Sequence, residues 1–278
     1  MSECNHDCSS CSANCSERTE QQDLRAKANV QSNVKKVIAV VSGKGGVGKS
    51  MVTSLLAVAL RRMDLSVGVL DADITGPSIP RAFGVKGGAE ACPDGLLPAK
   101  TKTDIGLMSV NLLLPDETDP VIWRGPVIAG TVTQFWTDVC WGDVDVLLVD
   151  MPPGTGDVPL TVFQSLPIDG IVVVTSPQEL VGMIVQKAMK MADMMNVPVL
   201  GVVENMSYIS CPDCGKKISV FGESKTAEIA ASYGTRLLAQ VPIQSELAKA
   251  MDKGSVELAD TDALCDAAGL IASLLEEK

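Results

Sequence analysis

Aromatic side chains are scarce in this chain of 278 residues, at 3% of the total, although 46% of its residues are hydrophobic. The core must therefore be built mainly from Val, Ile, Leu, Met and Ala. A core of that composition suits a parallel sheet that is buried on both faces. The mean hydropathy of +0.23 also favours a folded chain over a disordered one. The length allows one large α/β domain or two small ones.

Basic residues are fewer than acidic ones, with 23 Lys and Arg against 34 Asp and Glu. The formal net charge is −11 and the isoelectric point is near 4.6, and we find no basic patch along the sequence. Such a chain repels phosphate-rich partners. We therefore expect neither nucleic acid nor an anionic membrane surface among its partners.

Long apolar runs are missing as well. The first residues, MSECNHDCSSCSANC, contain no apolar segment of the kind found in a secretory signal. No run approaches the roughly 18 apolar residues that a membrane-spanning helix needs. We expect a soluble, cytoplasmic protein.

Histidine occurs once, at His6, whereas there are nine cysteines. Thiols stay reduced in the cytosol, so disulfides are disfavoured. Cysteines that cluster in a reducing compartment indicate a metal site, and six of the nine cluster in this way: Cys4, Cys8, Cys11, Cys15, Cys211 and Cys214. The other three are isolated, and we expect them to be small buried hydrophobes: Cys92, Cys140 and Cys265.

Apolar runs alternate with helical patterns along most of the chain. Residues 1–35 are polar and predict a disordered, cysteine-bearing tail, and residues 36–278 predict one folded domain. Within it we expect strands at 37–42, 66–73, 105–114, 144–150, 169–176, 197–206 and 237–242. Helices are expected at 49–63, 178–195, 223–233 and 260–276 with one more before the last, and a small hairpin before residue 104. This alternation predicts an α/β fold with a doubly wound, mostly parallel sheet.

The stretch VVSGKGGVGKS, residues 40–50, has the spacing of a phosphate-binding P-loop between a strand and a helix. Its backbone N–H groups would converge on phosphate oxygens. Lys49 would reach the β and γ phosphates of ATP, and the Ser50 hydroxyl would bind Mg²⁺. A chance match at a glycine-rich turn is the alternative, which the flanking strand and helix disfavour. The predicted nucleotide contacts are Gly43, Lys44, Gly45, Gly46, Val47, Gly48, Lys49 and Ser50.

Acidic residues follow two of the predicted strands. Asp150 ends the run VLLVD and would support the magnesium shell, and Gly154 in the turn after it can present an amide to the γ phosphate. Asp71 and Asp73 end the strand at 66–73. Either could orient the attacking water or contact the magnesium shell, and we favour Asp73 because it begins a flexible segment. Capping of the next element is the alternative.

Three motifs together resemble one family. SGKGGVGKS, DADITGPSIP and VDMPPGTGD are similar to the Mrp/Nbp35 family of iron–sulfur carrier ATPases, and the resemblance runs from about residue 35 to the C-terminus. That family belongs to the deviant Walker A type of P-loop NTPase, with MinD, ParA and the nitrogenase iron protein. The resemblance implies that Lys44 reaches across a dimer interface to the partner's nucleotide. The alternative is that Lys44 faces solvent or pairs with a local acid.

The resemblance also implies the contacts to the base. Asn205, which follows the strand ending in VVE, would read the adenine edge, and Pro242 in QVPI would line the same pocket.

The segment CPDCGKK, inside an expected insertion at 207–222, has the form of a metal knuckle. Its two thiolates, Cys211 and Cys214, are half of the usual four ligands of a zinc or iron–sulfur site. The other two ligands can come from an identical chain or from the N-terminal cysteines. Alternatively, Cys211 and Cys214 form a simple thiol pair, or they are half of a zinc site. A two-fold dimer would supply the other two ligands symmetrically. The resemblance implies the same arrangement, with one [4Fe–4S] cluster bridging a homodimer or a heterodimer with a paralogue.

Four cysteines near the N-terminus can wrap one metal centre locally: Cys4, Cys8, Cys11 and Cys15. Eukaryotic members of the family carry an N-terminal four-cysteine [4Fe–4S] site with wider spacing. We favour an iron–sulfur cluster here over zinc. In a zinc site, His6 could replace one cysteine.

These features predict a slow ATPase that holds a [4Fe–4S] cluster as a scaffold and transfers it to apo iron–sulfur proteins. One alternative is a positioning ATPase that resembles MinD or ParA, which the acidic composition disfavours. Another is an ATP-coupled redox donor that resembles the nitrogenase iron protein. The bridging cysteines of that protein lie in two separate segments, whereas here they form one CxxC motif.

The expected role of Lys44 leads to a testable prediction. Replacing Lys44 with Ala should lower the rate of ATP hydrolysis by about 100-fold, because a cation that acts on the transferring phosphoryl group is lost. Nucleotide affinity should change much less, since Lys49 remains. Steady-state hydrolysis and calorimetric ADP binding measure the two effects, and equal losses in both would contradict the prediction.

Overall fold

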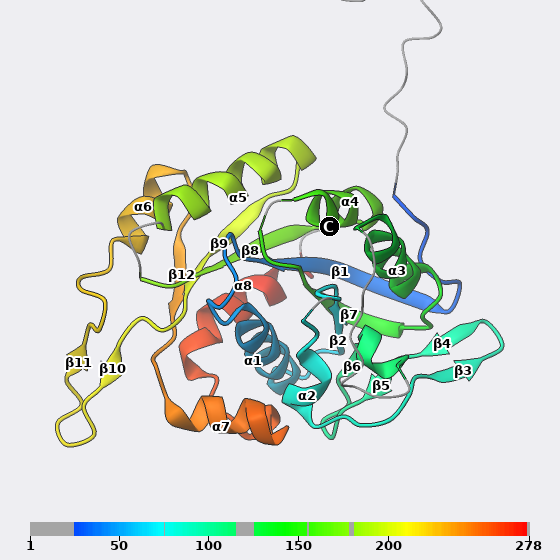
Figure 1. Cartoon of the computed structure of the whole chain (residues 1–278), viewed down its shortest axis with the longest axis horizontal. Coiled ribbons are helices and arrows are strands. Elements are labelled where there is room, and N and C mark those ends of the chain that lie inside the picture. Colours follow the sequence, from blue (N-terminus) through cyan, green and yellow to red (C-terminus); the bar gives the residue numbers. More distant parts are fainter. Residues whose placement is uncertain (1–24, 75, 115–124, 155, 178–180, 277–278) are drawn as a thin grey trace, which may run out of the picture.

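The computed structural model describes residues 25–74, 76–114, 125–154, 156–177 and 181–276. Within these residues, a central sheet is covered by helices on both of its faces (Figure 1). The predicted N-terminal cysteine cluster lies outside the described residues. The structure confirms an α/β fold with a doubly wound, mostly parallel sheet.

Eight strands of the described chain form the central sheet. All neighbouring strands in it are parallel except the last pair, which is antiparallel at one edge. Parallel neighbours require crossover connections, and helices provide them. In spatial order the strands are β12 (Leu237–Gln240), β9 (Val199–Glu204), β8 (Gly170–Thr175), β1 (Ser32–Val41), β7 (Gly142–Asp150), β2 (Val67–Asp71), β6 (Gly106–Met108) and β5 (Ala99–Lys100).

The central strand β1 supplies side chains to two separate cores. Successive strand residues point to opposite faces. Val37 and Ala39 accordingly pack into one apolar cluster, and Ile38 and Val40 pack into the other. The first core is covered by α3 (Gly125–Thr137), α4 (Asp157–Ser165), α5 (Val181–Met195) and α6 (Thr226–Ser232). The second is covered by α1 (Lys49–Arg62), α2 (Ile79–Phe83), α7 (Ser245–Lys253) and α8 (Cys265–Ser273).

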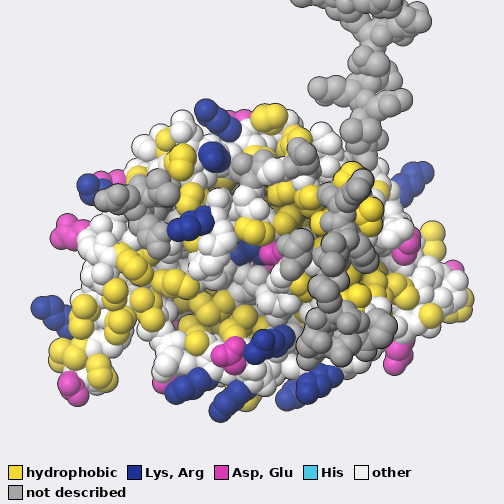
Figure 2. Space-filling model, viewed as in Figure 1, with side chains coloured by type: hydrophobic (Ala, Val, Ile, Leu, Met, Phe, Trp, Pro, Cys, Tyr) yellow, Lys and Arg dark blue, Asp and Glu magenta, His cyan; other side chains and the backbone are white. Residues whose placement is uncertain are grey.

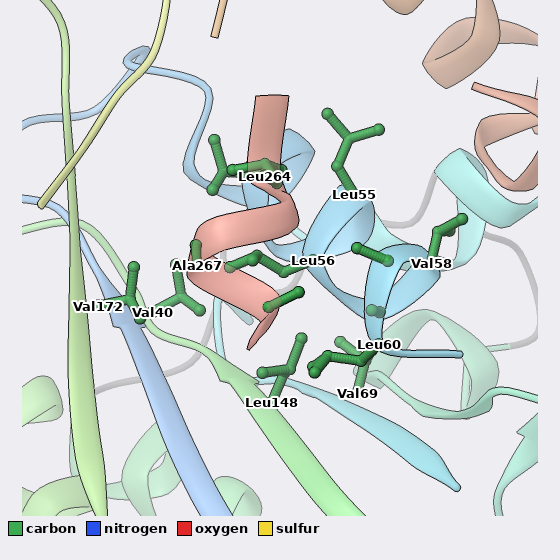
Figure 3. Packing of buried hydrophobic residues seen from close by; sticks show 14 of the residues in the cluster. Val40, Leu55, Leu56, Val58, Leu60, Val69, Leu148, Val172, Leu264 and Ala267 are labelled. Atoms are coloured by element: carbon green, nitrogen blue, oxygen red, sulfur yellow. The ribbon is translucent and has the colours of Figure 1, made fainter. Parts of the chain in front are cut away.

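Helix α1 lies against the middle of the sheet. Its Leu56 and Leu60 are fully buried and pack with Leu148 of β7 and with Ala267 of α8 (Figure 3). These contacts hold the N-terminus of α1 in a fixed position at the end of β1.

Several element boundaries differ from the prediction. Strand β1 begins at Ser32 instead of residue 37, because its polar first half pairs in register with β7 from Gly142 onward. The expected strand at 105–114 is a strand only over Gly106–Met108, followed by a 3-10 turn at Val110–Leu112. The expected helix at 260–276 is a 3-10 turn at Asp262–Leu264 followed by α8, and a further 3-10 turn spans Val256–Leu258.

The sequence reading missed three helices: the five-residue α2, in a segment that reads as a loop, and the longer α3 and α4. Helix α3 contains two glycines and several β-branched residues, and α4 has a proline in its first turn, so both have weak intrinsic helix propensity. Burial of their apolar faces against the sheet outweighs that propensity.

The expected small hairpin is present as β3 (Glu90–Cys92) and β4 (Gly95–Leu97). The Sγ atom of Cys92 lies 3.1 Å from that of Cys140. Burial, together with Cys92, raises the pKa of Cys140 to about 11, so this thiol stays protonated.

The expected burial of the isolated cysteines holds only in part. Cys140 is buried and Cys92 is half-buried, but Cys265 is exposed, so the expectation for Cys265 is wrong. The buried face of α8 is formed by Ala267, Ala268 and Ile271, which leaves Cys265 facing solvent. Among the described residues, no helix combines the length and the apolar character needed to cross a bilayer.

The packing of α1 leads to a stability prediction. Leu56→Ala removes a fully buried side chain and should lower the free energy of unfolding by about 2–5 kcal/mol, through lost burial and a residual cavity. Leu258→Ala is the matched control, because Leu258 is 86% exposed and its loss should cost less than about 0.5 kcal/mol. Urea unfolding measures both, and equal losses would show that α1 does not anchor the core.

Candidate functional site: a nucleotide edge and a cysteine arm

The predicted nucleotide-binding residues meet at one edge of the sheet. Val40 of β1 is in register with Asp150 of β7, and Asp150 is in register with Asp71 of β2. The carboxyl ends of these three parallel strands therefore bring the P-loop and two acidic residues together. Ligands of open α/β sheets bind at such an edge.

The P-loop connects β1 to α1 through a turn that depends on glycine. Gly46 and Gly48 have φ angles of 81° and 77°, in the left-handed region that favours glycine. A side chain at Gly48 would also collide with the amide of Asn205. Lys44 lies at the exposed tip of the loop, and Val47 is buried at its base.

A buried ion pair lies at the start of α1. Lys49 and Asp150 are 6% and 0% exposed, and the Lys49 Nζ lies 2.8 Å from the Asp150 Oδ1. The Ser50 and Thr53 hydroxyls each donate to Asp150 at 2.6 Å, one to each carboxylate oxygen. Sequence reasoning missed Thr53, although it lies one helical turn after Lys49. This network fixes an ammonium and a hydroxyl at the N-terminus of α1, where phosphates bind.

Asp71 holds the chain that follows β2. Its buried carboxylate accepts hydrogen bonds from the backbone N–H groups of Asp73 and Ile79 and from the Ser109 hydroxyl. Burial, and then the nearby Asp150 carboxylate, raises the pKa of Asp71 to about 8, against the opposing effect of Lys49. Asp71 thus shapes the loop that presents the half-buried Asp73.

The turn after β7 is joined directly to the P-loop strand. The Gly154 N–H donates to the Ser42 carbonyl at 2.8 Å, and Gly154 has a φ of 91°. The structure therefore places the predicted Gly154 amide beside the end of β1.

Asn205 contacts the P-loop from the end of β9. Its Nδ2 donates to the Val47 carbonyl at 2.9 Å, while its buried Oδ1 has no hydrogen-bond partner among the described residues. The buried hydroxyls of Ser42 and Thr175, at the ends of β1 and β8, likewise have none there. Leaving a buried polar atom without a partner costs about 1–3 kcal/mol, so these atoms suit an additional partner such as water, an ion or a ligand.

Pro242 is buried at the end of β12 and lines a cavity of about 230 Å³. Tyr208 and Thr261 line the same cavity, but Asn205 does not. The two predicted base contacts therefore lie at the ends of neighbouring strands without sharing this cavity.

The CxxC motif lies on an arm that leaves the sheet after β9. Strands β10 (Ile209–Ser210) and β11 (Lys217–Ile218) form an antiparallel hairpin that projects from the body beyond β12 (Figure 1). Cys214 is exposed and Cys211 is half-buried. Hydrogen bonds from the backbone N–H groups of Cys214 and Asp213 lower the pKa of Cys211, which favours its thiolate.

The arm offers two thiols and no complete metal site. Among the described residues, no group of three or more His, Cys, Asp or Glu side chains is placed to hold a metal ion. The structure thus brings Cys211 and Cys214 together, while Cys4, Cys8, Cys11 and Cys15 lie outside the described residues.

A comparison with known proteins fits this geometry. The family model described as NUBPL iron-transfer P-loop NTPase, of the ParA type, matches residues 33–275. This chain belongs to that family. It is 46% identical to the iron-sulfur cluster carrier protein of Methanocaldococcus jannaschii, over 91% of this chain and 90% of the relative. It is 48% identical to the iron-sulfur cluster carrier protein of Clostridium perfringens, over 81% of this chain and 82% of the relative.

Solved structures place this NUBPL-family chain among nucleotide-binding folds. A nucleotide-binding protein of Archaeoglobus fulgidus, solved in complex with ADP, is 45% identical, with a TM-score of 0.75 over 82% of this chain and 89% of that one. The cell division ATPase MinD of Pyrococcus furiosus has a TM-score of 0.58 over 86% of this chain and 99% of that one. At 19% identity, MinD shares the fold alone.

The buried ion pair generates the next prediction. Lys49→Met leaves Asp150 as an uncompensated buried charge and should destabilise the nucleotide-free protein by about 3–5 kcal/mol. Adding Asp150→Asn to the same chain removes that charge and should recover part of the loss, although ADP binding is lost in both proteins. Urea unfolding and calorimetry measure the effects. Strictly additive stability losses would show that the two side chains do not interact.

Proposed function

We propose that this NUBPL-family protein is an iron–sulfur cluster carrier that binds and slowly hydrolyses ATP. It holds a [4Fe–4S] cluster between two copies of the chain and passes it to apo iron–sulfur proteins. The observation that carries this proposal is the projecting arm, whose Cys211 and Cys214 provide half of a cluster's ligands. The names of the relatives from M. jannaschii and C. perfringens support it.

The residues at the strand ends fit a nucleotide with magnesium. Lys49 would bind the β and γ phosphates, and Ser50 and Asp150 would hold the cation. The Asn205 Oδ1, an acceptor without a partner among the described residues, suits the amino group of adenine. When bound, Mg·ATP supplies the phosphoryl group whose transfer to water drives the cycle. The similar Archaeoglobus protein, solved in complex with ADP, supports nucleotide binding by this fold.

Three residues are proposed for hydrolysis. Asp73, presented by the loop that Asp71 holds, orients the attacking water. Gly154 donates its N–H to the γ phosphate, for which it has to release the Ser42 carbonyl that it contacts here. Lys44, exposed at the loop tip, reaches the nucleotide of a second copy. A rearrangement of these loops on phosphate loss is a common way to couple hydrolysis to motion.

The cluster site is proposed at the interface of two arms. The apolar side chains of Ile209, Ile218, Val220 and Phe221 lie around the motif and are between 38% and 50% exposed. Hydrophobic side chains gather over the arm in Figure 2. An exposed apolar patch beside two thiols suits burial against a second copy. The N-terminal cysteines are proposed to hold a second cluster, and the protein to act in the cytoplasm.

Metal analysis tests the proposal. After anaerobic purification, a chain lacking residues 1–20 should contain about two iron and two sulfide per chain, which is half of a four-iron cluster. It should migrate as a dimer in size-exclusion chromatography, and should load an apo ferredoxin. Adding Cys211→Ser should abolish the iron, the sulfide and the transfer.

Cys265→Ser is the matched control, because Cys265 is exposed but lies outside the motif. It should retain the full cluster content. Zinc without sulfide in the truncated and the full-length chain would overturn the carrier proposal. Iron and sulfide that disappear with residues 1–20 would place the cluster on the N-terminal cysteines instead.

A further inference from the structure

A fully buried carboxylate lies between the cysteine arm and the sheet edge where the predicted nucleotide-binding residues meet. Glu204, the last residue of β9, is 0% exposed. Four side chains donate hydrogen bonds to it: Ser207 at 2.5 Å, Gln240 at 3.0 Å, Ser224 and Thr226. Ser207 and Gln240 donate to Oε1, whereas Ser224 and Thr226 donate to Oε2.

Three of these four donors come from the two ends of the arm, and Gln240 comes from β12. Ser207 precedes β10, and Ser224 and Thr226 follow β11 just before and at the start of α6. Oε1 therefore accepts from the entry of the arm and from β12, and Oε2 accepts from the exit. One side chain joins the two chain segments that carry the CxxC motif.

The arm has few other attachments, among them Lys217, whose Nζ lies over the ring of half-buried Tyr208, 4.3 Å from its centroid. Between residues 209 and 225 every side chain is exposed except that of Cys211, which is half-buried. A segment without a buried core of its own is oriented by its attachment points. The entry is also attached through backbone bonds from Ser207 to Val241 and from Ile243 to Tyr208. At the exit, Ser224 and Thr226 are bonded to Glu204.

The neighbouring residue connects Glu204 to the nucleotide edge. Asn205 directly follows Glu204, and its Nδ2 binds the P-loop carbonyl of Val47. Asn205 begins the turn that follows β9. Its side chain contacts the P-loop, whereas the side chain of Glu204 contacts the arm's attachment. The two residues share one peptide bond, so a backbone shift at Asn205 acts directly on Glu204.

We propose that Glu204 is a positioning residue that transmits nucleotide occupancy from Asn205 to the orientation of Cys211 and Cys214. This inference rests on the proposed nucleotide site, but it does not require that the thiols hold a cluster.

The chemistry of the site requires a carboxylate. Burial raises the pKa of Glu204, but the hydrogen bonds from Ser207, Ser224, Thr226 and Gln240 outweigh burial and lower it, so the group is ionised. Both oxygens can then accept two bonds at once. In Glu204→Gln the charge is lost and one oxygen becomes an NH₂ group, so the hydroxyls there have to accept in place of donating to a carboxylate. The attachment at one end of the arm is weakened, while the shape of the side chain is retained.

Thiol alkylation in the apo protein provides the test. Iodoacetamide labelling of Cys211 and Cys214, resolved peptide by peptide, is followed with and without saturating Mg·ADP, with the exposed Cys265 as internal reference. In the wild type, ADP should change the two rates by about fivefold, at the low end of coupling between sites. In Glu204→Gln this dependence should be reduced, because the bonds to the arm lose their charged acceptor. ADP affinity should change by less than about threefold, since Asn205 and the P-loop are intact.

Glu257→Gln is the matched control. Glu257 is also a buried carboxylate that accepts a threonine hydroxyl, from Thr103 at 2.5 Å, but it lies outside the arm and the nucleotide edge. This variant should keep the wild-type response to ADP. Ser224→Ala, which removes one bond at the exit, should reduce the response and serves as the second variant if Glu204→Gln does not fold.

Two results would overturn the inference. One is a wild-type response to ADP that persists in both Glu204→Gln and Ser224→Ala, and the other is a wild type that binds ADP without any change in thiol reactivity. Failure of the carrier proposal is distinguishable, because it shows in the iron and sulfide content. A chain without a cluster whose arm still responds to ADP through Glu204 would leave the inference standing.

Discussion

The ammonium of Lys49 and the carboxylate of Asp150 face each other inside the protein, 2.8 Å apart and almost without contact with water. Two buried charges are stable only when each is compensated, so the start of α1 and the end of β7 are held in one relative position. The hydroxyls of Ser50 and Thr53 complete the cage around the carboxylate. The base of the P-loop is thereby held beside a paired, buried ammonium. The same carboxylate helps raise the pKa of Asp71, which in turn holds the loop of Asp73.

The parallel sheet explains why two chemically different sites are neighbours. Within the central sheet every strand except the edge strand β5 runs in the same direction, so the turns that carry the predicted site residues emerge at one edge. The P-loop follows β1, the acidic turns follow β2 and β7, and the cysteine arm follows β9. The relative from M. jannaschii is named an iron-sulfur cluster carrier protein, and the Archaeoglobus protein was solved in complex with ADP. In the proposed coupling, the consecutive residues Glu204 and Asn205 connect the two sites along this shared strand edge.

The sequence pattern is sufficient to predict the buried strands, but it does not reveal two of the longer helices or the exposure of Cys265. The central strands were recognisable because buried parallel strands are continuous apolar runs such as VLLVD. Helices α3 and α4 were not recognised, because glycine, proline and β-branched residues masked their periodicity and the sheet supplies their stability. Cys265 was expected to be buried from its residue type alone, but the orientation of α8 exposes it. The N-terminal cysteines lie outside the described residues and stay a prediction.

Motifs whose residues are close together in the chain can be recognised from the amino-acid order alone. The P-loop and the CxxC motif are of this kind, because a turn or a knuckle is specified by its own few residues. Which distant residues complete these motifs depends on the folded chain. Asp150 pairs with Lys49 although the two belong to elements far apart in the sequence. Glu204 gathers Ser224, Thr226 and Gln240 because strand order and the return of the arm bring them to one carboxylate. Such contacts leave no spacing pattern in a sequence, since they arise only when the sheet assembles.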